Sequence, residues 1–177
     1  MIQFDTIDYL QHGNVKQQKV YAVLNKNSIL TQLIKFDPIL VGSIPINIDI
    51  DESDLDIICF SNDLAEFRAT VTSCFGEKED FKLKEIKIGT HYTVIANFKL
   101  DGFQLEIFGQ PVPTKQQAGY RHMVIEYNLL KKNGNNFRQQ IIELKRRGFK
   151  TEPAFALVLG LKGDPYSELL KLDGLVD

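Results

Sequence analysis

The stretch Leu40-Val41-Gly42-Ser43, followed after ten residues by Asp54-Leu55-Asp56-Ile57, decides the fold of this chain. The apolar run before the turn predicts a short buried strand that ends at Gly42-Ser43. The run Leu55 to Phe60 predicts a second buried strand. Alternate residues of a strand face the same side, so the two aspartates of the second run should project together, away from its apolar residues.

The paired aspartates predict a metal site, and the turn before them predicts a phosphate site. Two carboxylates as close as Asp54 and Asp56 repel each other, so both stay ionised only if a cation lies between them. Carboxylate oxygens are hard ligands that suit Mg²⁺ or Mn²⁺. The Gly42-Ser43 turn offers free backbone N–H groups and a small hydroxyl, and its lack of bulk allows close approach to a polyphosphate.

A third acid lies in a later strand. The run Tyr92 to Leu100 is rich in strand-forming residues, and Asp101-Gly102 joins it to Phe103 to Phe108, which is a hairpin signal. Glu106 is the central acid of this apolar strand. Burying an acid without a partner is costly, so Glu106 should face a cleft or a metal. The alternative interpretation is an acid on an edge strand that faces water.

Helical patterns flank these strands. Asn14 with Gln17 three residues later predicts a capped helix start. The stretch Ser61-Asn62-Asp63 can cap a second helix with an apolar face. Thr151 and Asp164 can each cap a further short helix near the end of the chain.

Together these patterns predict an α/β (α+β) protein with a small mixed β-sheet, flanking helices and a helical C-terminal part. Residues 1–113 are expected to form the core, which contains the N-terminal helices and the sheet. Residues 114–177 are expected to form a helical extension packed on that core, so that the chain is one structural unit.

This order of residues resembles the signature of the DNA-polymerase-β-like nucleotidyltransferases. The signature is a hydrophobic residue, Gly-Ser, a spacer of about ten residues, and then Asp-hydrophobic-Asp-hydrophobic. In that superfamily a third carboxylate arrives later on an adjacent strand, and Glu106 matches it in type and order. The resemblance implies transfer of a nucleoside monophosphate from a nucleoside triphosphate such as ATP, with two Mg²⁺ or Mn²⁺ ions and release of pyrophosphate. It also implies residue roles. Gly42 and Ser43 would hold the β- and γ-phosphates, Asp54 and Asp56 would bind both metals, and Glu106 would bind the catalytic metal.

Further segments resemble a bacterial branch of the superfamily that is known as a domain of unknown function. This likeness covers nearly the whole chain, but it implies no substrate. The segments are Gly42 to Ile46, Phe108 to Pro111, Tyr120 to Met123 and Lys150 to Phe155.

Composition bears on the partners. A formal net charge of −2 over 177 residues gives no general reason to expect nucleic-acid binding, which usually needs a basic face. We therefore expect a small molecule or a protein as the acceptor, and nucleic acid is disfavoured. No apolar stretch approaches the length that spans a bilayer, and the start lacks a secretory signal. These features predict a cytoplasmic protein with no membrane partner, in which Cys59 and Cys74 are reduced thiols.

Two rival functions remain open at this point. A glycosyltransferase also uses Asp-x-Asp to hold a metal, but the upstream Gly42-Ser43 and the later Glu106 argue against that class. A module that binds nucleotides or a partner without turnover is disfavoured by the presence of all three carboxylates. Arg121 and His122 can either reach a phosphate or acceptor, or form a pair on a helix surface. Asp49, Asp51 and Glu52 are interpreted as a solvated acidic loop.

Overall fold

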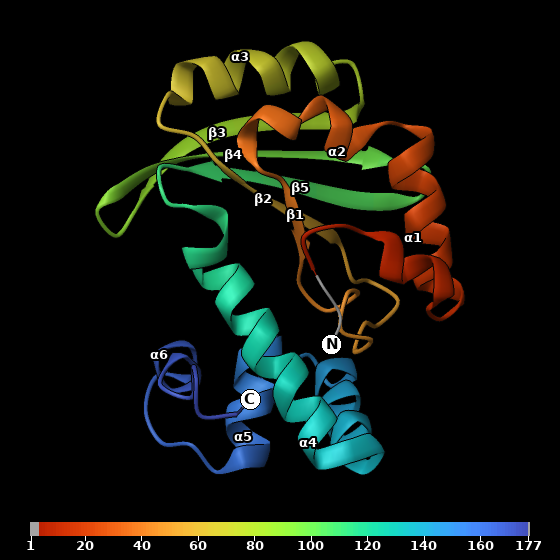
Figure 1. The fold of residues 1–177 in the computed structure, drawn as a ribbon, viewed down its shortest axis with the longest axis vertical. Coiled ribbons are helices and arrows are strands. Elements are labelled where there is room, and N and C mark those ends of the chain that lie inside the picture. The colour runs from red at the N-terminus through yellow and green to blue at the C-terminus, as the bar shows by residue number, and fades with distance from the viewer. Residues whose placement is uncertain (1–3, 177) are drawn as a thin grey trace. The chain divides into compact units, whose positions relative to one another are not determined.

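A computed structural model describes residues 4–176 and contains one five-stranded mixed sheet (Figure 1). The strand order is β1-β2-β5-β4-β3; β2 and β5 run parallel, and the other neighbours are antiparallel. The predicted mixed sheet with flanking helices is confirmed. The strands are β1 (Ile39–Val41), β2 (Leu55–Phe60), β3 (Glu79–Ile88), β4 (His91–Leu100) and β5 (Phe103–Gln110).

Helices precede, interrupt and follow the sheet. The α-helices are α1 (Val15–Lys26), α2 (Ile29–Gln32), α3 (Leu64–Phe75), α4 (Ala118–Arg146), α5 (Thr151–Leu159) and α6 (Pro165–Leu170). The short 3₁₀ turns are η1 (Asp8–His12), η2 (Ile34–Phe36) and η3 (Thr114–Gln116). None of the helices in the described part of the chain is long and apolar enough to cross a membrane.

The chain forms two compact units that do not follow sequence order. The first, here the sheet unit, contains Met1–Val41 and Asp54–Gln117. The second, here the helical unit, contains Gly42–Ser53 and Ala118–Asp177. The loop between β1 and β2 is therefore grouped with the C-terminal helices, although the strands on both sides of it belong to the sheet.

The β4–β5 hairpin follows from its turn residues. Asp101 and Gly102 have φ angles of 46° and 85°. A two-residue hairpin turn whose twist matches that of the strands requires positive φ angles at both residues. The predicted hairpin is confirmed. Its consequence for the site is that β5 lies between β2 and β4. The alternative interpretation of Glu106 as an acid on an edge strand is therefore wrong.

Helix α3 covers one face of the sheet (Figure 1). Its buried face consists of Phe67, Val71 and Phe75, as the sequence pattern predicts. The Phe75 ring stacks on Phe98 of β4 with the ring centroids 5.1 Å apart. Burial of aromatic side chains is the largest stabilising contribution per residue in such a core, so this contact anchors α3 on the sheet.

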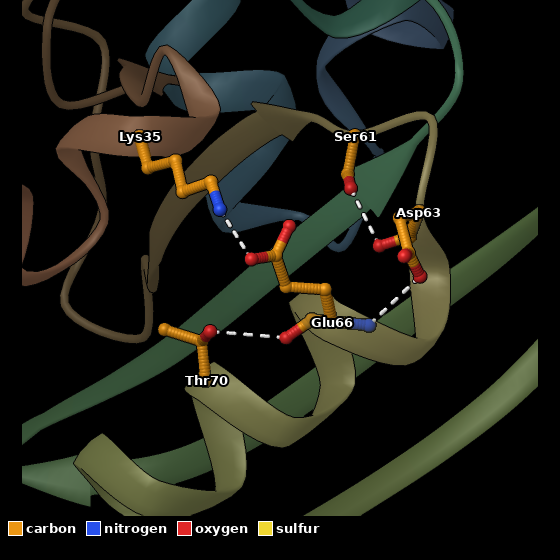
Figure 2. Close-up of polar contacts among 5 residues, drawn as sticks. All are labelled: Lys35, Ser61, Asp63, Glu66 and Thr70. Atoms are coloured by element: carbon orange, nitrogen blue, oxygen red, sulfur yellow. Dashed lines mark hydrogen bonds and ion pairs between the residues drawn. The ribbon is translucent and has the colours of Figure 1, made fainter.

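The start of α3 is held by local polar contacts (Figure 2). The Asp63 carboxylate accepts a hydrogen bond from the backbone N–H of Glu66 at 2.9 Å, so the cap lies in the predicted stretch and is its last residue. The Ser61 hydroxyl donates to the Asp63 carbonyl at 2.7 Å, and Lys35 pairs with the Glu66 carboxylate. Loss of a cap of this kind typically costs about 1 kcal/mol, so these contacts determine where the helix begins.

The contact between α3 and β5 requires a glycine at position 109. A Cβ atom added at Gly109 would lie 2.1 Å from the Cε1 atom of the Phe67 ring. We therefore expect Gly109→Ala to lower the free energy of unfolding by about 1–3 kcal/mol, because overpacking forces side chains or backbone to move. Urea unfolding measures the change. A Phe67→Leu background should recover part of the loss, and equal losses in both backgrounds would show that the ring is not the obstacle.

In the helical unit, α4 is divided at Gly134, whose φ of 75° and ψ of −166° are not helical. Helix α5 begins at Thr151 with Lys150 as its cap residue, so the prediction of Thr151 as the cap is wrong by one position. The Thr151 hydroxyl instead accepts a hydrogen bond from Lys145 Nζ at 3.1 Å. Asp164 caps α6 through the backbone N–H of Ser167 at 2.8 Å, as predicted.

Candidate functional site

The parallel pairing of β2 and β5 places two of the predicted acids side by side. Asp56 and Glu106 are register partners, so their side chains leave the same face of the sheet. Neighbouring strands lie about 4.8 Å apart, which sets the spacing of the two Cα atoms. Asp54 directly precedes β2 and is exposed, while Asp56 and Glu106 are half-buried. The structure thus brings together the acids of two segments far apart in the chain.

Burial on the opposite face of the sheet determines which way the acids point. Leu55, Ile57, Leu105 and Ile107 alternate with the acids and are fully buried. A shift of one residue in either strand would bury a carboxylate under α3 and expose these side chains, and burying an unpaired charge is strongly unfavourable. The apolar residues of β2 and β5 therefore hold Asp56 and Glu106 on the partly exposed face.

The row that contains Asp56 and Glu106 continues across the sheet in both directions. Val41 of β1 is the register partner of Asp56. On the other side, Glu106 is paired with Asn97 of β4, and Asn97 is paired with Lys82 of β3. The sequence patterns do not single out Asn97 or Lys82, because periodicity within a strand does not reveal which residues lie opposite each other.

The donor atoms of the three predicted acids fit a divalent metal that arrives with its substrate. Asp54, Asp56 and Glu106 offer only carboxylate oxygens, which Mg²⁺ and Mn²⁺ prefer. Among residues 4–176, no three His, Cys, Asp or Glu side chains are gathered closely enough to hold a metal ion as they stand. Mg²⁺ commonly keeps several waters and uses one or two carboxylates together with substrate phosphates. The paired acids fit that kind of shared site.

Gly42 and Ser43 begin the segment that belongs to the helical unit. Gly42 follows Val41 in the chain and has a φ of 88°, a backbone conformation that favours glycine. The Ser43 carbonyl accepts a hydrogen bond from the N–H of Ile48 at 3.1 Å, and the Ser43 hydroxyl donates to the Ser53 hydroxyl at 3.2 Å. The predicted turn is thus closed by contacts within Gly42–Ser53.

Arg138 of α4 supports the same segment. Its Nη1 atom donates to the carbonyls of Ile46 at 2.6 Å and Asn47 at 2.9 Å. Asn47 itself has a positive φ of 59°. A planar guanidinium is suited to holding two carbonyls at once. No pattern in the sequence indicates this role, because Arg138 and the segment are far apart along the chain.

Arg121 and His122 are committed to contacts within the helical unit. Arg121 pairs with Asp173, with Nη2 2.8 Å from a carboxylate oxygen. His122 is only 6% exposed, and its Nε2 lies 2.9 Å from the Tyr166 carbonyl. The interpretation of the two as a surface pair is therefore wrong for His122, because the α6 residue Tyr166 and the α5 residue Glu152 lie against that side of α4.

Glu126 is a buried acid that the sequence patterns also miss. Its side chain is 3% exposed, and Oε1 has no hydrogen-bond partner in the described part of the chain. Burial raises the pKa of Glu126 well above its usual range; Glu152 raises this pKa further, and Lys145 opposes the shift. We therefore expect Glu126 to be protonated and neutral in the folded protein.

Most of the chain matches one protein family. Residues 22–172 match the family described as "Domain of unknown function (DUF4269)". None of the curated proteins is similar enough in sequence to match.

Solved structures of nucleotidyltransferases share the fold. Cid1, described as having RNA terminal uridylyl transferase activity, is 9% identical with a TM-score of 0.54, over 78% of this chain and 45% of Cid1. A mutant of the Cid1 poly(U) polymerase bound to MgATP is 12% identical with a TM-score of 0.53, over 86% and 47%. A chain of the GLD-2/RNP-8 complex is 15% identical with a TM-score of 0.53, over 86% and 57%. This chain spans about half the length of these proteins, and the likeness at such identity concerns the fold alone.

Proposed function

The chain belongs to the DUF4269 family, and we propose that it is a nucleotidyltransferase that moves a nucleoside monophosphate from a nucleoside triphosphate to a hydroxyl group. Pyrophosphate is the second product. The observation that carries this proposal is the register pair of Asp56 and Glu106 on adjacent parallel strands, in a fold shared with nucleotidyltransferases. Fold alone does not imply function, so the acids at this position are the decisive feature.

The residues have separate roles in the proposed reaction. Asp54 and Asp56 hold the metal-bound triphosphate, and the Gly42-Ser43 turn binds its β- and γ-phosphates through backbone N–H groups. Glu106 orients the acceptor hydroxyl toward the α-phosphorus. Two magnesium ions, when bound, supply charge neutralisation at the attacking and leaving oxygens. The fit of carboxylate oxygens to Mg²⁺ and the MgATP bound to a Cid1 mutant support this choice of metal and nucleotide.

The acceptor is proposed only as a hydroxyl. The expectation of a small molecule or protein rests on the net charge of −2, which is a property of the whole chain. Among the structural neighbours, Cid1 is described both as a poly(U) polymerase and as having RNA terminal uridylyl transferase activity. The comparisons therefore give no support to the exclusion of nucleic acid.

Thermal melting tests the metal–nucleotide site without a known acceptor. A ligand that binds only the folded state stabilises it by about 2.7 kcal/mol at 100 times its Kd, which corresponds to roughly 5–10 °C for a chain of this size. We expect MgATP, or another Mg–triphosphate, to raise Tm by this order. Asp56→Asn should lose most of the increase, yet melt no lower when empty, because it relieves repulsion with Glu106.

Asp51→Asn is the matched control, since Asp51 is an exposed acid in the predicted solvated loop; it should keep the full increase in Tm. An Asp56→Asn protein that melts lower when empty and responds normally to MgATP would show that Asp56 is structural. Release of pyrophosphate in the presence of cell extract then separates an enzyme from a binding module. A preference for nucleotide-sugars over triphosphates would instead favour a glycosyltransferase.

A further inference from the structure

The face of the sheet that carries the acids extends beyond Glu106 to the edge strand β3. One row runs from Glu106 through Asn97 to Lys82, and the next runs from Phe108 through Ile95 to Lys84. Register partners share a face, so both lysines leave the sheet on the same side as Glu106. These rows lie entirely within the sheet unit.

The dimensions of the rows follow from sheet geometry. Each lysine is separated by β4 from the β5 residue in its row. The Cα of Lys82 is therefore about 10 Å from that of Glu106, and the Cα of Lys84 is about 10 Å from that of Phe108. Lys82 and Lys84 are two residues apart along β3, which separates them by about 7 Å. Of the two β4 residues in between, Asn97 is half-buried and Ile95 is buried. A group placed over Asn97 would thus have the Glu106 carboxylate on one side and the Lys82 ammonium group on the other, with Phe108 and Lys84 in the next row.

Lys82 and Lys84 differ from the nearby Lys99, which is held in ion pairs with acidic side chains. Lys99 forms ion pairs with Asp80 at 2.7 Å and Glu79 at 3.3 Å. Lys82 and Lys84 are exposed, and neither lies within ion-pair distance of an acid in the described residues, although the charge of Lys82 contributes to the lowered pKa of Asp80. Their ammonium groups therefore remain able to bind an anionic ligand.

Phe108 adds an aromatic surface next to the acid. It follows Glu106 by two residues on β5, so both side chains lie on the same face, and it is half-buried. Basic side chains combined with an aromatic ring are typical of surfaces that bind single-stranded nucleic acid, because the bases stack on the ring and the cations contact the phosphates.

We propose that Phe108, Asn97, Lys82 and Lys84, here called the acceptor strip, bind the 3′ end of a single-stranded nucleic acid. The terminal base stacks on Phe108, and the phosphodiester groups pass over the half-buried Asn97 to reach Lys82 and Lys84. The terminal hydroxyl is then placed at Glu106. This part of the inference rests on the proposed function, in which Glu106 orients the acceptor hydroxyl. The net charge of −2 does not oppose this inference, because the strip is locally basic and the acids lie at its other end.

The strip has a competing explanation that the chain itself allows us to test. Lysines on an edge strand also prevent strands of different molecules from pairing. Lys87 lies on the same strand but on the opposite face, where it is paired with Tyr92 and its Nζ is 5.9 Å from the centre of that ring. A lysine that only protects the edge should behave in the same way on either face.

The test measures binding of a short single-stranded RNA, labelled at its 5′ end, by fluorescence anisotropy over a range of salt concentrations. Each phosphate contact contributes about −0.7 to the slope of log Kobs against log salt concentration for a single strand. The double substitution Lys82→Gln with Lys84→Gln should therefore make the slope shallower by about 1.4. Lys87→Gln should leave the slope unchanged. Phe108→Leu should weaken binding about 5- to 150-fold without changing the slope, since stacking is not ionic.

Thermal melting confirms that each variant is folded before binding is compared. Equal slopes for the wild type and the double variant, an equal effect of Lys87→Gln, or no RNA binding by the wild type would each overturn the acceptor strip. The Tm increase of the wild-type protein with MgATP is measured in parallel. If that increase is present while the strip fails, only the acceptor inference is lost; if it is absent, the proposed function itself is contradicted.

Discussion

Replacing Glu106 with Gln should lower the rate of nucleotidyl transfer by at least about 10²-fold, because the loss of a positioned acid or base commonly costs that much. Gln keeps the shape of the side chain but removes the charge. Asp54 and Asp56 remain to hold the metal-bound triphosphate, so the increase in Tm with MgATP should largely persist. The measurements are the rate of pyrophosphate release, once an acceptor is found, and thermal melting with and without MgATP.

Glu85→Gln is the control for this substitution. Glu85 is also an acid on a strand of the sheet, but it is exposed and lies on β3, where its register partner is the buried Val94. It therefore points to the face opposite Glu106 and should transfer at the wild-type rate. If Glu106→Gln has a near-normal rate, Glu106 has no part in the reaction. If it instead loses the response to MgATP, Glu106 acts mainly in binding.

Replacing Glu126 with Gln should stabilise the protein above about pH 5 and flatten its stability profile. Burial is the main cause of the raised pKa of Glu126, and Glu152 is the second. The folded protein thus keeps a proton that the unfolded chain releases above its ordinary value of 4.5. Because the folded state binds more protons, the contribution of Glu126 to the free energy of unfolding is largest below pH 4.5 and falls as pH rises toward the folded pKa. One proton gives a slope of at most about 1.4 kcal/mol per pH unit.

Urea unfolding across this pH range measures the effect. The wild-type free energy of unfolding should fall with rising pH, and the difference from Glu126→Gln should widen over the same range. Glu143→Gln is the matched control, because Glu143 is an exposed acid in the second half of α4, beyond the break at Gly134. It should follow the wild-type profile. A Glu126→Gln protein with the wild-type slope would show that Glu126 is ionised in the folded state.

The sequence by itself determines the local features of this protein. Asp101-Gly102 predicts the β4–β5 hairpin because only certain residues accept two positive φ angles in succession. The stretch Ser61-Asn62-Asp63 predicts the start of α3 because a short polar side chain can accept a hydrogen bond from the first unpaired N–H groups of a helix. The alternation in Asp54-Leu55-Asp56-Ile57 predicts that the two aspartates share a face. Each of these inferences depends on atoms within a few residues of one another.

Only the tertiary structure decides what lies beside the acids. Alternation shows that Glu106 leaves one face of its strand, but the partner at that position is set by the parallel pairing of β2 and β5, which are separated in sequence by α3 and the β3–β4 hairpin. The same holds for Asn97 and Lys82 in that row, and for Arg138, which supports a segment far away in the chain. Register and packing minimise the free energy of the whole chain, through burial of apolar side chains drawn from all its elements. A pattern read within one element therefore shows which face a residue occupies, but not its neighbour on that face.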